Sequence, residues 1–329
     1  MDLALVAVVA LAMLFSYTNG FHDSANAIAT SVSTRALTPR IALALAAIAN
    51  LLGAFFGMRV AETIGAGIVD AGGATLALCA AALVGAIGWN LLTWWFGLPS
   101  SSSHALIGGL VGAALVGGVT VQWGTALELV VVPMVLSPLI GLALGWAAMT
   151  AIGRLFGHRD RQEVSRRFRY AQTVSAAAMA FGHGMQDAAK VAGVVVLALI
   201  ASGRHTVDDG DFVPWWVVLL SGVVMSLGTY AGGWRIMRTL GRRIIPLTPA
   251  QGFAAEASAA VTLAVATAFR APISTTYAIT AAIMGVGSSR NVRDVRWDVG
   301  RDILVAWVAT LPGAALAAAA VHAVLRVLS

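Results

Sequence analysis

Long apolar segments alternate with short polar loops along the whole chain. A helix crosses a bilayer with about 20 consecutive apolar residues, and at membrane depth the backbone satisfies its polar groups only as helices or closed barrels. The pattern therefore predicts an all-α polytopic membrane protein. The first half has apolar segments at about 3–30, 41–58, 74–96, 104–119 and 126–152. The second half has them at about 172–201, 214–234, 251–268, 274–288 and 302–325.

Several of these segments are short for a full membrane span. The shortest border clusters of Gly, Pro and Ser, such as the stretch at 97–104, so we expect broken or re-entrant helical hairpins there. A membrane β-barrel would show short segments of alternating polarity, whereas these segments are continuously apolar.

Composition supports a membrane protein. Of the 329 residues, 59% are hydrophobic and 11% are charged, whereas about a quarter of a soluble domain is charged. The single Cys79 lies in an apolar run, so we expect neither an intrachain disulfide nor a cysteine-based metal site. The N-terminal run 1–15 lacks a basic flank and leads directly into a polar motif, so we expect a retained transmembrane segment and no cleaved signal peptide.

The basic residues gather in four loops, which together hold 16 of the 21 Lys and Arg residues. Placing these loops in the cytoplasm obeys the positive-inside rule and puts the loop 202–212, with Asp208, Asp209 and Asp211, outside. We therefore expect a multi-pass protein of the inner (plasma) membrane, with both termini outside, and no nucleic-acid partner. The loops carry Arg35 and Arg40; Arg154, Arg159, Arg161, Arg166, Arg167 and Arg169; Arg235, Arg238, Arg242 and Arg243; and Arg290, Arg293, Arg296 and Arg301.

Each half has an odd number of apolar segments, so two similar halves would be inverted relative to each other. This predicts a first inverted repeat at 1–153, a basic cytoplasmic linker at 154–170 and a second inverted repeat at 171–329.

Two polar motifs occur in both halves in the same order. Asp23 and Asn26 align with Asp187 and Lys190, the only lysine in the chain. Further along, the run 97–104 aligns with the run 270–277. Ionisable groups at membrane depth are costly and are retained mostly at functional sites. Duplicated sites, one in each half, indicate a transporter built from repeats.

The second motif suits an anion. A helix starting at Pro99 or Pro272 would present unpaired backbone N–H groups and the positive end of its dipole, followed by several hydroxyls. If both tips meet near the midplane, they would form one anion cradle. The alternative is N-capping and close helix packing. The candidate anion-binding residues are Ser101, Ser102, Ser103, Ser274, Thr275 and Thr276.

The first motif suits a cation. Residues three apart share one helix face, so Asp23 and Asn26 would offer carboxylate and amide oxygens to a proton or a hard cation such as Na⁺. Asp187 and Lys190 make the same face with an ammonium group in place of the amide. A purely structural ion pair between these two is the alternative interpretation.

These motifs resemble the PiT family of inorganic phosphate transporters. The resemblance covers nearly the whole chain and rests on NGFHDSANAIAT at 19–30, GLPSSSSH at 97–104, FGHGMQDAAKVAG at 181–193, GFAAEASAA at 252–260 and PISTTY at 272–277. It implies an inverted-repeat transporter that moves phosphate with a coupling cation, as a homodimer in membrane lipid. It also implies a coupling role for Asp23, Asn26 and Asp187 and phosphate binding at the hydroxyl tips. Glu256 matches the acidic residue of the family's GFxAE segment, and we expect it to bind the coupling cation together with Asp23 and Asp187.

The chain departs from the family pattern in its second half. Lys190 stands where many sodium-coupled members have Asn, which resembles the bacterial low-affinity, proton-coupled branch. Tyr277 stands where a His is usual, and Arg270 where a Gly is usual; Arg270 is expected to contact an anion or to extend to the interface.

The leading hypothesis is phosphate import by symport, with H⁺ favoured over Na⁺, either as free phosphate or as a divalent metal–phosphate complex. No cofactor is expected beyond the coupling ion. If that ion is a metal, Asp23, Asn26 and Asp187 are its expected ligands. His22, His104, His183 and Tyr277 are candidates for a proton relay or an anion contact, with hydrogen-bonded packing as the alternative.

Three other functions remain open at the sequence level. Sulfate has the same tetrahedral oxygens and would fit the same scaffold, and a passive anion channel would use the same donors. An intramembrane hydrolase would need Ser101 or Ser102 in contact with His104 and Asp23. Ser102 and His104 are two apart and point to different helix faces, so we do not expect an enzyme.

Overall fold

The computed structural model describes residues 2–206 and 212–328, and the regular elements within them are all helices. An isolated bridge pairs Val69 with Val121. The prediction of an all-α protein is confirmed. The acidic residues Asp208, Asp209 and Asp211 lie outside the described residues.

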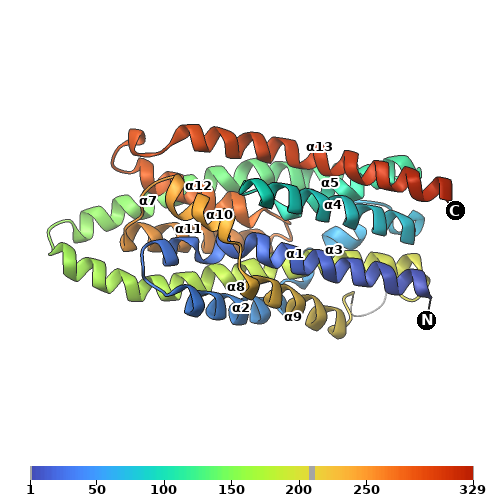
Figure 1. Ribbon diagram of the computed structural model, residues 1–329, viewed down its shortest axis with the longest axis horizontal. Helices are drawn as coiled ribbons and strands as arrows, with labels where there is room; N and C mark the ends of the chain where they lie inside the picture. Colours follow the sequence, from blue (N-terminus) through green and yellow to red (C-terminus); the bar gives the residue numbers. More distant parts are fainter. Residues whose placement is uncertain (1, 207–211, 329) are drawn as a thin grey trace.

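Among the described residues, five helices are long and apolar enough to cross a membrane. They run roughly along the long axis of the molecule (Figure 1). They are α1 (Leu3–Ser33), α4 (Leu76–Phe96), the helix made of α6, η2 and α7 (Trp123–Phe156), α8 (Arg161–Ala201) and α13 (Trp297–Leu328).

Two further apolar helix pairs are sharply bent, as in a broken span or a re-entrant loop. One pairs α2 (Pro39–Ala54) with α3 (Met58–Ala66) and bends by 69°. The other pairs α9 (Trp215–Ala231) with α10 (Trp234–Arg238) and its continuation η3 (Thr239–Arg243), and it bends by 58°. These bends confirm the expectation of broken helices.

The two halves use the same order of elements in opposite directions. Each has a long helix (α1 or α8), a bent pair, a helical hairpin and a last long helix (α7 or α13). α1 runs away from the end that carries both termini, whereas α8 runs toward it; α7 and α13 are related in the same way (Figure 1). This is the arrangement of two inverted-topology repeats.

The repeats are interlocked. α1 packs on α9 and α8 packs on α2, so the first helix of each half contacts the bent pair of the other. Glycine makes this contact possible, because a Cβ at Gly20 would lie 2.2 Å from the Met225 carbonyl oxygen. The hairpins repeat the exchange, since α5 (Ser102–Gly117) packs on α13 and α12 (Thr275–Ser288) packs on α7.

The basic linker differs from the expected loop. α7 (Val132–Phe156) extends into the first residues of the predicted linker 154–170, and α8 begins within that linker, at Arg161. The Asp160 side chain accepts hydrogen bonds from the backbone of Gln162 and Glu163, which starts the helix early.

The hairpin tips also begin later than predicted. In place of a start at Pro99 or Pro272, α5 and α12 begin three residues further on, at Ser102 and Thr275. α11 (Pro249–Ala268) precedes α12 in the second hairpin. An extended linker therefore separates the two helices of each hairpin, because the helix start is set by the capping serine and the proline lies outside it.

Candidate functional site

Both hairpin tips meet at one carboxylate, that of Asp23 on α1. Ser102 Oγ donates to Asp23 Oδ2 at 2.8 Å. Thr276 Oγ1 donates to Asp23 Oδ1 at 3.4 Å. The structure thus joins the first cation motif to hydroxyls of both repeats.

Asn26 lies on the same face of α1 as Asp23 and donates to the second tip. Its Nδ2 donates to Thr276 Oγ1 at 2.9 Å and to Thr275 Oγ1 at 3.3 Å. Its Oδ1 is buried and has no hydrogen-bond partner among the described residues. A buried acceptor without a donor is costly, and here it is free to accept from a ligand.

Lys190 connects the two repeats from the other side. Its Nζ donates to Ser103 Oγ at 2.6 Å, to Asp187 Oδ1 at 2.9 Å and to the Ile273 carbonyl at 2.6 Å. These three acceptors match the three N–H groups of an ammonium. The lysine is therefore saturated by one residue of each tip and by its own helix partner.

Asp187 also lies close to a histidine. His183 Nε2 is 3.0 Å from Asp187 Oδ2, and His183 Nδ1 is 3.0 Å from Asn50 Oδ1 on α2. Asp23, His183 and Asp187 offer ligand atoms within 4.8 Å of one another, a spacing that a metal ion could bridge. His183, predicted as a relay residue, thus joins the carboxylates, and Asn50 is a partner that the sequence analysis missed.

The second histidine beside a carboxylate is His22. Its Nδ1 lies 2.7 Å from Asp23 Oδ1, and its Nε2 faces Thr93 Oγ1 at 3.2 Å and Ser100 Oγ at 3.4 Å. Ser100 in turn donates to Thr93 at 2.8 Å. Since its hydroxyl proton is directed to Thr93, Ser100 is arranged as a member of a polar network.

Two of the predicted anion-binding hydroxyls act as helix caps. Ser101 Oγ accepts from the His104 backbone N–H at 3.2 Å, and Ser274 Oγ accepts from the Tyr277 backbone N–H at 3.2 Å. Each satisfies one of the N–H groups left free at a helix start. Ser102 and Thr276 instead donate to Asp23, while Ser103 accepts from Lys190 and Thr275 accepts from the Asn26 amide.

The site is buried and carries fixed charge. Asp23, Asp187 and Lys190 are each at most 2% exposed. Two carboxylates and one ammonium leave an excess of negative charge when the histidines are neutral. An anion would therefore need an additional proton or cation to enter beside Asp23.

Comparison with known proteins identifies the family. Residues 19–318 match the model of the phosphate transporter family. The chain belongs to the phosphate transporter family. This confirms the resemblance seen in the motifs.

Individual relatives cover nearly the whole of this family member. A protein of Rhizobium meliloti (strain 1021), described as "Probable low-affinity inorganic phosphate transporter", is 46% identical over 96% of this chain and 94% of its own. A Bacillus subtilis (strain 168) protein of the same description is 39% identical over 100% of both chains. A solved structure described as "The sodium-dependent phosphate transporter" superimposes with a TM-score of 0.86 at 27% identity, covering 99% of this chain and 100% of that one.

Family membership decides the class of activity. The relatives are transporters, so the expectation that this phosphate transporter family member is no enzyme is confirmed. The geometry agrees, since neither ring nitrogen of His104 has a hydrogen-bond partner among the described residues. Ser101 and Ser102 therefore lack the hydrogen bond to the His104 ring that a hydrolase would need.

Glu256 lies outside the cluster around Asp23. It is fully buried on α11 and accepts from Thr30, from Ser175 Oγ at 2.5 Å and from Gln172 Nε2 at 3.3 Å. Thr30 is one helical turn beyond Asn26, so this carboxyl group belongs to a second polar cluster. None of the ion pairs among residues 2–206 and 212–328 includes it.

His104 and Tyr277, which occupy matching positions in the two repeats, lie side by side. Their ring centroids are 4.9 Å apart, and the Tyr277 ring stacks on Trp307 at 3.9 Å. Trp307 Nε1 donates to the Pro99 carbonyl at 3.0 Å. This aromatic group therefore ties α13 to both tips. Arg270 lies apart from it, in an exposed pair with Glu62 at 3.3 Å.

The second tip is held by a residue that the sequence analysis left without a role. Gln186 Nε2 donates to Thr267 Oγ1 at 2.8 Å and to the Ala271 carbonyl at 3.2 Å, while its Oε1 accepts from the Ile273 backbone N–H at 3.2 Å. Its role could have been suspected from the sequence, because Gln186 is a polar residue directly beside Asp187 in an apolar segment.

Proposed function

We propose that this chain imports inorganic phosphate by symport with a cation, and that the cation is a proton. The observation that carries the choice of ion is the position of Lys190. Its ammonium has three oxygen neighbours at 2.6–2.9 Å, which is the kind of oxygen environment that a hard cation would seek. A fixed positive charge stands where a sodium ion would need to bind.

The anion-binding part of the proposal is supported by the two tips. Ser102 and Thr276 place hydroxyl donors at Asp23, and both lie in the first turn of helices whose N-termini favour negative charge. A phosphate oxygen arriving there would accept from these hydroxyls in place of the carboxylate.

Charge balance supports coupling to a proton. Asp23 and Asp187 carry two negative charges against one on Lys190, so a phosphate anion is repelled unless another positive charge arrives with it. Asp23 and His22, 2.7 Å apart, are a pair of groups that can hold such a proton next to the hydroxyls. The loaded site would then change conformation with little net charge.

The residues also fit a divalent metal–phosphate cargo. Asp23, His183 and Asp187 offer oxygen and nitrogen ligands within one small group, and Asn26 Oδ1 adds a free acceptor. In this version the metal travels as part of the substrate. The difference from the sequence prediction is that His183 joins the expected ligand set.

Uptake of labelled phosphate into proteoliposomes tests the proposal, with the pH gradient, Na⁺ and Mg²⁺ varied separately. We expect saturable uptake that follows an inward proton gradient with Na⁺ absent. Uptake that requires Na⁺ and ignores the pH gradient would contradict proton coupling. Linear uptake without saturation or coupling would indicate a passive channel.

We also propose the orientation of the chain and its assembly. Both termini lie at one end of the molecule and the turn between α7 and α8 lies at the other (Figure 1), which supports placing the termini outside the cell and the linker in the cytoplasm of a plasma-membrane protein. Cysteines introduced at either end of the molecule, labelled in intact cells with a reagent that does not cross the membrane, test this orientation. Cross-linking in membranes tests the homodimer expected from the resemblance.

A further inference from the structure

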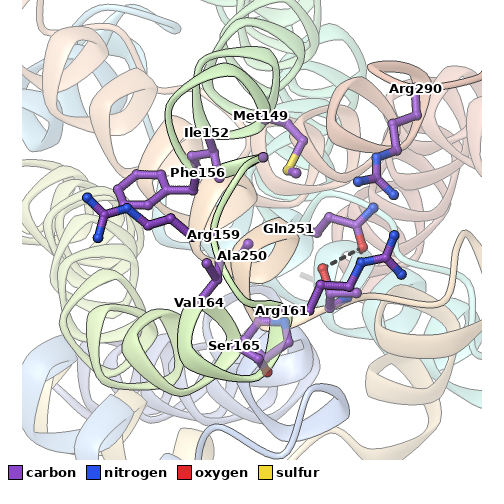
Figure 2. Close-up of a pocket in the computed structure, with 14 residues that line it drawn as sticks. Met149, Ile152, Phe156, Arg159, Arg161, Val164, Ser165, Ala250, Gln251 and Arg290 are labelled. Atoms are coloured by element: carbon purple, nitrogen blue, oxygen red, sulfur yellow. Dashed lines mark hydrogen bonds between the residues drawn. The ribbon is translucent and has the colours of Figure 1, made fainter.

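A cavity of about 310 Å³ lies far from the hairpin tips, at the end of the molecule opposite the chain termini. It is formed by the last turns of α7, the start of α8, the start of α11 and Arg290 (Figure 2). The membrane-crossing segment that includes α7 ends at Phe156. The cavity therefore sits where that helix leaves the apolar layer.

One side of the cavity presents hydrogen-bond donors. Arg161 and Arg290 both direct their guanidinium groups toward the Gln251 side (Figure 2). Both side chains are exposed, and neither has an ion pair or side-chain hydrogen bond within the described part of the chain. Gln251 Oε1 accepts from Thr248, which leaves the amide N–H groups of Gln251 free to donate.

The other side of the cavity is apolar. Met149, Ile152 and Phe156 share one face of α7, at the spacing of successive helical turns. Arg159 lies on this far side, with its guanidinium carbon 5.9 Å from the centre of the Phe156 ring. This apolar wall offers no hydrogen-bond donors to a small soluble anion, whereas it can contact a hydrocarbon chain.

We propose that this cavity binds an anionic phospholipid, with its phosphate on Arg161 and Arg290 and one acyl chain along the Met149–Phe156 face. Basic pockets between helices at the membrane surface are suited to acidic head groups, and guanidinium groups pair well with phosphate oxygens. The apolar wall supplies the contact for the acyl chain. This site is separate from the residues assigned to phosphate transport.

Spin-labelled phosphatidylglycerol tests the proposal, with the purified full chain in phosphatidylcholine bilayers. For the wild type, R161Q and R290Q we measure the selectivity, which is the association of labelled phosphatidylglycerol with the protein relative to that of spin-labelled phosphatidylcholine. The matched control is R301Q, which removes a charge from an arginine 79% exposed, near the start of α13 and outside the cavity. We expect each cavity variant to lose selectivity by about fivefold, with R301Q close to wild type.

Two results would overturn the proposal. An equal loss of selectivity in R301Q would show that the basic end of the molecule attracts acidic lipid without a defined site. Displacement of the labelled lipid by inorganic phosphate or by soluble glycerophosphoglycerol would show a site for soluble anions. Phosphate uptake by the same preparations checks that each variant is folded.

Discussion

Lys190 on α8 donates to Ser103 Oγ across 2.6 Å, although the two residues belong to opposite repeats. The same ammonium holds Asp187 and the Ile273 carbonyl. One buried cation thus connects both hairpin tips to α8. A change in either tip must alter its surroundings, which places Lys190 where coupling between ion and anion would act.

Lys190→Asn should make the transporter respond to sodium. The substitution removes the ammonium and leaves Asp187 with an amide three residues away, as Asp23 has Asn26. We expect proton-driven uptake to fall by about tenfold or more, because the buried Asp187 carboxylate loses its paired positive charge. Sodium should restore part of the rate.

A binding measurement separates this prediction from a purely structural role. A ligand that binds only the folded state raises its stability, so Na⁺ should raise the melting temperature of Lys190→Asn and leave that of the wild type unchanged. The same concentration of choline is the control. If the variant keeps its rate and its proton coupling, Lys190 serves only as a structural partner of Asp187.

Asp23→Asn should abolish coupling while preserving the fold. The amide oxygen can still accept from Ser102 or Thr276, yet the side chain no longer carries a negative charge or takes up a proton. We expect the uptake rate to fall by at least about tenfold, because hydrogen bonds to charged groups contribute about 1.5–3 kcal/mol each. The matched control is Asp70→Asn, at an exposed aspartate that caps a short helix. Normal proton-driven uptake by Asp23→Asn would exclude this carboxyl group from the mechanism.

Much of the fold follows from periodic patterns that the sequence displays directly. Continuous apolar runs predicted the helices, and the repeated Asp motifs predicted that α1 and α8 occupy equivalent positions in the two repeats. The partners of the site residues come from tertiary packing, which sequence spacing does not encode. Asn50 reaches His183 because Gly184 lets α2 approach α8 closely, a Cβ there lying 2.2 Å from the Asn50 carbonyl oxygen.

The neighbours of Glu256 are a second example of contacts that sequence spacing does not encode. Its motif predicted a place beside the coupling residues, and the structure places it against Thr30, Ser175 and Gln172. Which turn of α1 faces α11 depends on how the two helices cross. The sequence alone does not reveal how α1 and α11 cross. The position of Glu256 in its motif therefore did not predict which residues it contacts.

Phosphate should be distinguished from sulfate by the acceptor at the tips. Asp23 accepts from Ser102 and Thr276, so it can also accept the proton that a hydrogen phosphate carries. Sulfate has no such proton and would bring its oxygens against the carboxylate. We expect arsenate, which carries protons as phosphate does, to compete with labelled phosphate uptake, and sulfate to compete at least about tenfold more weakly. Equal competition by sulfate would point to a general oxyanion transporter.

Ser101 and Ser102 are neighbours in sequence and should behave differently when replaced by alanine. Ser101 caps α5 through the His104 backbone N–H, so Ser101→Ala should lower stability by about 0.5–2 kcal/mol with little change in the KM for phosphate. Ser102 donates to Asp23, so Ser102→Ala should raise the KM by about three- to tenfold, the value of one hydrogen bond, an increase that Ser101→Ala should lack. Melting temperatures and uptake kinetics on the same samples measure both effects.

The second tip supplies an internal repeat of the test, since Ser274 is the cap and Thr276 the donor to Asp23. If the KM rises for the caps and stays constant for the donors, the hydroxyls beside Asp23 do not bind phosphate.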